Sequence, residues 1–283
     1  MKLDRSRVRS ALIALLKLVL FAALFYVFQQ VIASALLAVF RTGAFLLDTL
    51  ATLGAAVLAG GLLLRALDDQ PVSALGFGLH RGALRQLAVA LALGVAGLGV
   101  AGVLLLLLGR LRYLPQAGTA GGWLGGSVNM LLALLIPAAA EEALFRGYPF
   151  QKLVQALGPV LATVAASAAF AIAHRHNPAV NGLALVNIFA AGVMLSVAFL
   201  RTRSLWVATG VHLGWNWSMA ALLDLPVSGL ELYDAPLYQP VDRGPGWLTG
   251  GAFGPEAGLA GLLGLLLVLG GIVILTRKTR WLT

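Results

Sequence analysis

The sequence contains no cysteine and little charge. Only 11% of its 283 residues are Asp, Glu, Lys or Arg, whereas 60% are hydrophobic. Soluble domains carry about 25% charged residues, so this composition excludes an ordinary water-soluble protein. The absence of cysteine excludes thiolate metal sites and a catalytic cysteine. It says little about the redox compartment, because a chain this apolar is expected to lie in lipid.

Long apolar segments fill most of the chain. Windows of close to 20 residues can cross a hydrocarbon core of ~30 Å as helices. They fall at roughly 10–32, 43–66, 84–108, 126–145, 159–174, 183–200, 205–223 and 257–276. The first follows a basic start that resembles a signal peptide, but no soluble mature domain follows a plausible cleavage site, so we expect a retained helix. We therefore predict an all-α, polytopic integral membrane protein with about eight transmembrane helices.

The basic residues are unevenly distributed between the connections. With the N-terminus inside, eight spans place most of them on one side: Lys2, Arg5, Arg7, Arg9, Arg65, Arg81, Arg85, Arg146, Lys152, Arg201, Arg203, Arg277, Lys278 and Arg280. Fewer fall on the other side: Arg41, Arg110, Arg112, Arg175 and Arg243. The positive-inside rule then predicts a multi-pass protein of the cell's inner (plasma) membrane with both termini in the cytoplasm. No extended basic domain or aromatic-basic motif supports a nucleic-acid partner.

We expect a single integral membrane domain with three parts. Residues 1–120 hold the first three spans and a surface connection at 67–83, residues 121–224 form a catalytic core in spans four to seven, and residues 225–283 hold a loop and the last span. The segment 225–255 is rich in proline and glycine, which predicts irregular extracytoplasmic structure. A loop of this length is either a functional cap or a tolerant connection, and the sequence leaves both open.

Ionisable side chains inside apolar spans are costly, so each one is a candidate for function. The fourth span ends in "EEALFR", residues 141–146. Glu142 and Arg146 are four residues apart with the acid first, which favours a helical ion pair. Glu141 points about 100° away around the helix and is free to face a cavity. The alternative is that both glutamates only place charge at a membrane boundary.

Two further spans carry matching polar residues. Glu141 and His174 are equally distant along the chain from the turn signal Leu157-Gly158-Pro159, so a helical hairpin brings them to the same level. His212 and Asn216 are separated by one helical turn and share a face of the seventh span. A lone histidine on an apolar helix is usually a packing residue. Here, however, a carboxylate, two histidines and an asparagine all need buried partners.

Three ordered motifs carry a family resemblance: "EEALFR" at 141–146, "FAIAH" at 170–174 and "HLGWN" at 212–216. Together they resemble the CPBP family (CAAX protease and bacteriocin-processing, or ABI) of intramembrane proteases, which includes the type II CAAX prenyl endopeptidases. The similarity covers about 120–220. The other spans match only in general character, and the Ala/Leu/Gly-rich chain with compact loops looks bacterial.

The resemblance implies hydrolysis of peptide bonds in hydrophobic, membrane-associated or lipidated peptides. Glu141 would act as general base on a water molecule, helped by His174, while His212 and Asn216 would stabilise the oxyanion. Glu142 and Arg146 would be structural. This mechanism needs no cofactor, and its partners are the peptide or protein substrate and the lipid bilayer.

Other functions stay open at this stage. Glu141, His174 and His212 could instead hold zinc with an open position for water, although Asn216 is a poor zinc ligand and a good oxyanion donor. A non-catalytic membrane scaffold or bacteriocin immunity protein would use the same polar residues only to hold helices together. A proton-coupled transporter is disfavoured because the chain has no internal repeat.

Overall fold

The computed structural model describes residues 5–40 and 43–278, and these are almost entirely helical. The elements are α1 (Arg5–Val39), α2 (Ala44–Asp68), η1 (Val72–Leu75), α3 (Ala83–Leu107), β1 (Leu111–Pro115), α4 (Ala120–Arg146), α5 (Tyr148–Ala173), α6 (Gly182–Thr202), α7 (Leu205–Trp217), η2 (Ser218–Leu222), β2 (Tyr238–Asp242), α8 (Gly246–Thr249), η3 (Gly251–Phe253), η4 (Pro255–Ala257) and α9 (Leu259–Lys278). The expected all-α class is confirmed.

Six stretches of the described residues are long and apolar enough to cross a membrane. One of them, 120–173, contains both α4 and α5. Helix α7 is shorter, but its axis continues through the π-helical turn η2 to Leu222. Within the described residues the bundle therefore contains eight long helices, in agreement with the predicted polytopic membrane protein.

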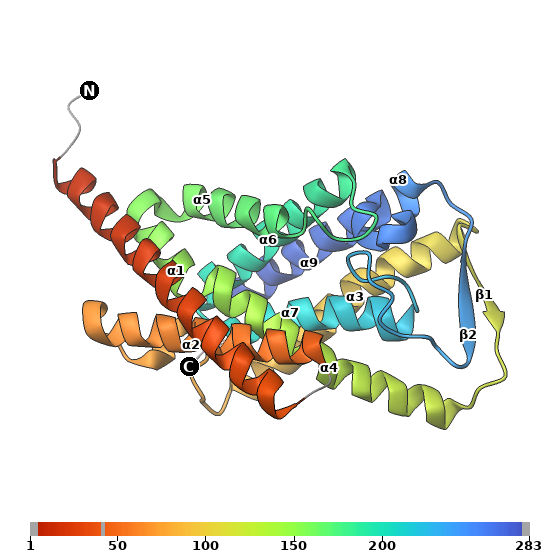
Figure 1. Ribbon diagram of the computed structural model, residues 1–283. Coiled ribbons are helices and arrows are strands. Elements are labelled where there is room, and N and C mark those ends of the chain that lie inside the picture. Colours follow the sequence, from red (N-terminus) through yellow and green to blue (C-terminus); the bar gives the residue numbers. More distant parts are fainter. Residues whose placement is uncertain (1–4, 41–42, 279–283) are drawn as a thin grey trace.

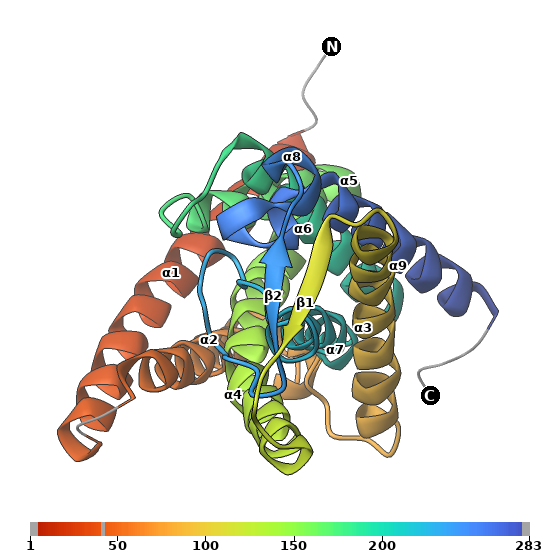
Figure 2. The same cartoon turned by 90° about the vertical axis from the view of Figure 1, so that its right-hand side faces the viewer.

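The long helices form one bundle, and the connections lie at its two ends (Figure 1). At one end, β1 and β2 form a short antiparallel ribbon in which Tyr113 pairs with Pro240. Figure 2 looks onto this end, where the ribbon and α8 lie over the helices. The segment 225–255 is irregular over much of its length, as predicted, but it also contributes β2, α8 and η3, which were not predicted.

The hairpin predicted between Glu141 and His174 is interrupted twice. Gly158 has φ 78° and ψ 167°, so the helix breaks at the predicted turn signal. A second break, which the sequence analysis did not predict, falls at Gly147 between α4 and α5, where a side chain would overlap the carbonyl of Ala143. The two breaks isolate the segment 148–157 from the arms that carry Glu141 and His174.

The closest helix packing is between α3 and α7. Gly94 on α3 and Gly210 and Gly214 on α7 each lie against the backbone of the opposite helix, so that even a Cβ atom would overlap it. Small residues allow this approach, which provides packing energy where lipid offers no hydrophobic driving force. The contact holds α7, with His212 and Asn216, in the centre of the bundle.

Candidate active site

The four predicted catalytic side chains line one cavity. Glu141 lies near the end of α4, His174 follows the last residue of α5, and His212 and Asn216 lie on α7. The cavity measures about 300 Å³, and its walls come from α4, α5, α6, α7 and the segment after η2. Their lining of this common space is the geometry that the predicted mechanism requires.

Glu141 directs its carboxylate toward both histidines. Its Oε2 atom lies 3.9 Å from Nε2 of His174 and 3.9 Å from Nε2 of His212. These separations are too long for direct hydrogen bonds and suit a group placed between them. Oε2 is itself buried and has no hydrogen-bond partner among the described residues. A buried carboxylate oxygen without a partner is costly, so it requires an explanation.

Glu142 has the opposite environment. Its carboxylate is fully buried, and its Oε1 atom accepts a hydrogen bond from Nη1 of Arg146 at 3.2 Å. Arg146 also donates from Nη2 to the carbonyl of Gly192 on α6 at 3.2 Å. The predicted ion pair between Glu142 and Arg146 is therefore present, and it ties α4 to α6 at the level of the cavity.

Each of the two histidines is oriented by a bond to its Nδ1 atom. Nδ1 of His174 lies 2.8 Å from the carbonyl oxygen of Phe170, which can only accept. Nδ1 of His212 lies 2.9 Å from Oε1 of Glu142. Both contacts favour a proton on Nδ1. In each ring, Nε2 then faces Glu141 and is the atom that can gain or lose a proton. The link between Glu142 and His212 was not predicted.

Phe170 gives the cavity much of its apolar wall. The centre of its ring lies 4.7 Å from that of His174, and the ring packs edge-on to Phe145. The guanidinium carbon of Arg146 lies 4.4 Å from the centre of the Phe170 ring. The ring thus covers the buried cation and supports His174. Phe170 was predicted only as part of a motif, although its spacing of four from His174 places the two on one helical face.

The segment after η2 closes one side of the cavity. Glu256 accepts hydrogen bonds from Nε1 of Trp215 at 3.2 Å and from Oγ of Ser228 at 2.5 Å. Asn177 donates to the carbonyl of Ser228 at 3.1 Å. All four residues line the cavity. We call residues 225–257 the cap. Glu256 was missed because no local pattern links it to Trp215, which neighbours Asn216.

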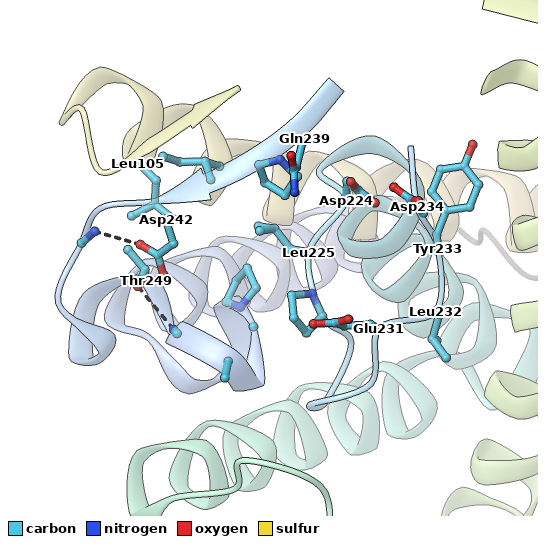
Figure 3. Close-up of a pocket in the computed structure, with 18 residues that line it drawn as sticks. Leu105, Asp224, Leu225, Glu231, Leu232, Tyr233, Asp234, Gln239, Asp242 and Thr249 are labelled. Atoms are coloured by element: carbon cyan, nitrogen blue, oxygen red, sulfur yellow. Dashed lines mark hydrogen bonds between the residues drawn. The ribbon is translucent and has the colours of Figure 1, made fainter. Parts of the chain in front are cut away.

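A larger cavity lies between the cap, the end of α3 and β1, and measures about 830 Å³ (Figure 3). Four carboxylates line it, from Asp224, Glu231, Asp234 and Asp242. Burial raises the pKa of Asp224 above its usual range, although the amide of Ala235 donates to it. None of the predicted catalytic residues lines this cavity. Its size is therefore no argument that the chemistry takes place there.

The zinc alternative can be tested against the donor atoms. Two ligands about 2.0–2.1 Å from a tetrahedral zinc ion lie roughly 3.3 Å apart. The two contacts of Glu141 Oε2 with the histidines are both 3.9 Å. Among the described residues, no three His, Cys, Asp or Glu side chains are arranged to hold a metal ion. The residues as they lie do not fit zinc.

The fold defines the chain as a polytopic integral membrane protein with a polar site inside its helical bundle. Residues 123–218 match the family described as type II CAAX prenyl endopeptidase Rce1-like. This segment contains all six predicted site residues, so the similarity to the family covers the candidate active site. The match supports a CAAX-type intramembrane peptidase. No curated protein matches the chain.

Proposed function

We propose that this protein hydrolyses peptide bonds of hydrophobic or lipidated peptides within the membrane, with Glu141 as the general base. One observation carries the proposal. Oε2 of Glu141 is buried without a partner and lies 3.9 Å from Nε2 of each histidine. A water molecule or a substrate carbonyl between these atoms would satisfy the carboxylate, and no packing role of Glu141 accounts for this arrangement.

The proposed reaction begins with a water molecule held between Glu141 and His174. The carboxylate of Glu141 takes a proton from the water, whose oxygen attacks the carbonyl carbon of the scissile bond. A tetrahedral intermediate forms with negative charge on the former carbonyl oxygen. The C–N bond then breaks, and the proton held by Glu141 passes to the leaving nitrogen. The products are a new carboxyl group and a new amine, and Glu141 returns to its starting state.

His212 and Asn216 would stabilise the oxyanion from α7. The Asn216 amide donates without change of charge, whereas His212 keeps the proton on Nδ1 for Glu142 and can donate from Nε2 only as an imidazolium. The charges of Glu141, Glu142, Arg146 and a protonated His212 sum to zero. This balance supports a charged donor at Nε2, where it would act most strongly on the developing oxyanion.

The cavity also reaches the surface that lipid would cover. Phe45 of α2 is one of its lining residues and is 57% exposed on the outside of the bundle. Apolar side chains such as Phe145 and Ile188 continue the wall inward. A hydrophobic peptide can therefore approach Glu141 laterally without crossing a polar surface. This access supports a substrate that is itself in the membrane.

The test is cleavage of a prenylated CAAX peptide and of an unlipidated hydrophobic peptide by purified protein. Glu141→Gln keeps the size of the side chain and removes the base, so kcat should fall by about 10²–10⁴. The matched control is Glu231→Gln, because Glu231 is exposed and lies outside the catalytic cavity. Equal cleavage by wild type and Glu141→Gln would remove the proposed role. It would favour the rival membrane scaffold or immunity protein.

We further propose that the reaction needs no cofactor. Extensive dialysis against a zinc chelator should leave kcat unchanged, because every proposed proton transfer uses side chains of the chain itself. Loss of activity on chelation that is restored specifically by zinc would establish the alternative, with Glu141, His174 and His212 as ligands.

A further inference from the structure

A polar cavity lies at the predicted cytoplasmic end of the bundle, away from the candidate active site. It measures about 400 Å³ and opens between the end of α2, the start of α5 and the residue after α6. Its polar lining consists of Asp68, Gln70, Ser73, Gln151, Lys152, Gln155 and Arg203. Nothing in the proposed peptidase mechanism uses these residues.

The cavity carries more positive than negative charge. Asp68 is the only carboxylate among the described residues that line it. The Oδ1 atom of Asp68 accepts from Lys17 and from Lys152, both at 2.7 Å, and its Oδ2 atom accepts from Tyr148 at 3.0 Å. One carboxylate thus serves two ammonium groups and a phenol. It has little capacity left for another cation.

Arg203 adds a third positive charge. Its Nη2 atom donates at 3.5 Å to the neutral side-chain oxygen of Gln151, and its guanidinium lies over the ring of Phe199. With Lys17 and Lys152, the site holds three cations against Asp68 and has a net charge of +2. Lys152 is almost fully buried, so the excess charge is only partly hydrated. An anion would relieve this imbalance.

An apolar groove adjoins the polar cavity. It measures about 360 Å³ between α1 and α5 and is lined by Ala11, Leu12, Leu15, Leu18, Leu153, Ala156 and Leu157. Consecutive residues connect the two features. On α1, Lys17 contacts Asp68 and Leu18 lines the groove. On α5, Lys152 lines the cavity and Leu153 lines the groove. A charged cavity that adjoins an apolar groove suits an amphiphile, which has a charged headgroup joined to a hydrocarbon chain.

We propose that this paired site binds an anionic phospholipid, with its phosphate in the polar cavity and an acyl chain in the groove between α1 and α5. Lys152 and Arg203 would contact the phosphate, and the glutamine amides would donate to its remaining oxygens. The lipid would fill the space between α1 and the rest of the bundle. The proposal is independent of the peptidase function and would stand without it.

The test is lipid binding to the purified full-length protein in detergent, measured by native mass spectrometry. Phosphatidylglycerol should bind more tightly than phosphatidylcholine with the same acyl chains. Arg203→Gln should weaken phosphatidylglycerol binding about fivefold and leave phosphatidylcholine unchanged. Arg203 is exposed, so the variant should remain folded. The matched control is Arg85→Gln, an exposed arginine on the same predicted side that does not line the cavity.

A second variant separates a lipid from a free phosphate. Leu15→Trp fills the groove from a partly exposed position and should weaken phosphatidylglycerol binding, because the acyl chain loses its place. The proposal is overturned if the two lipids bind equally or if Arg85→Gln has the same effect as Arg203→Gln. It is also overturned if inorganic phosphate displaces phosphatidylglycerol while Leu15→Trp binds it normally, because that pattern describes a phosphate site without a lipid.

Discussion

Two adjacent glutamates of one helix occupy opposite environments. Glu142 is fully buried between Arg146 and His212, whereas the Glu141 side chain is 34% exposed and faces the cavity. The rotation of about 100° between neighbouring residues of a helix is sufficient to produce this difference. The arrangement separates a carboxylate that holds the site together from one that is free to react.

The first prediction concerns the charge of Glu142. Glu142→Gln leaves the buried guanidinium of Arg146 without its counter-ion and weakens the orientation of His212. We expect a loss of about 3–5 kcal/mol of stability, the usual cost of breaking a buried ion pair from one side. Thermal unfolding of the purified protein measures it. Glu141→Gln is the matched comparison and should unfold at a temperature close to that of wild type, because Glu141 makes no short ion pair. Equal destabilisation by both changes would contradict the division of roles between the two glutamates.

The residues of this site differ in how far the sequence could predict them. Helical spacing was enough for the pair formed by Glu142 and Arg146 and for the shared face of His212 and Asn216. The contact between Glu142 and His212 joins helices far apart in sequence, and Glu256 meets Trp215 only after the cap has folded over α7. Such contacts depend on tertiary packing, and no local period encodes them.

At the scale of elements, the position of α7 depends on glycine. Gly214 lies on the same helix as His212 and Asn216, and a side chain there would overlap the backbone of Leu91 on α3. The α3–α7 contact is therefore a positioning element for the proposed oxyanion donors. It acts by setting the distance between the two helix axes.

The second prediction follows from this contact. Gly214→Ala should force α3 and α7 apart, cost about 1–3 kcal/mol of stability as other overpacking changes do, and lower kcat by misplacing His212 and Asn216. Gly99→Ala on α3 is the matched control, because a Cβ atom there meets no other atom within 4 Å. Unfolding and peptide cleavage are measured on the same samples. Normal activity of Gly214→Ala would show that the helix contact does not position the donors.

The third prediction concerns the cap. Trp215→Phe keeps the aromatic wall and removes the indole donor to Glu256, a hydrogen bond to a charged group worth about 1.5–3 kcal/mol. The cap should then close less firmly, so KM should rise about tenfold with a smaller change in kcat. Trp247→Phe is the control, since Trp247 is 58% exposed on α8 and outside the cavity. An unchanged KM for Trp215→Phe would mean that this bond does not hold the cap over substrate.

The spans were predictable because an apolar window of membrane length has few other stable structures. The turn at Gly158 was also predictable, since glycine followed by proline interrupts a helix. The β1–β2 ribbon was not. Its strands lie in segments far apart along the chain, and the short strands 111–115 and 238–242 carry no marked alternation. The break at Gly147 likewise depends on how α4 and α5 pack.

At the scale of the whole molecule, the two ends of the bundle have different chemistry. The end with the β1–β2 ribbon and the cap carries the acidic cavity, whereas the opposite end carries the cavity with Lys152 and Arg203. Among the described residues, Arg65, Arg201 and Arg203 lie at this second end, in or directly after the last turns of α2 and α6. By the positive-inside rule, we expect that end to face the cytoplasm and the acidic cap to face the outside.

This orientation gives the last prediction, which the absence of cysteine makes easy to test. Single cysteines introduced as Arg81→Cys and Glu231→Cys are the only thiols in each variant. In intact cells, a membrane-impermeant maleimide should label the cysteine at 231 at once and the cysteine at 81 only after permeabilisation. Leu98→Cys, fully buried on α3, is the unlabelled control. Labelling of position 81 but not 231 from outside would invert the topology. It would place the cap on the cytoplasmic side.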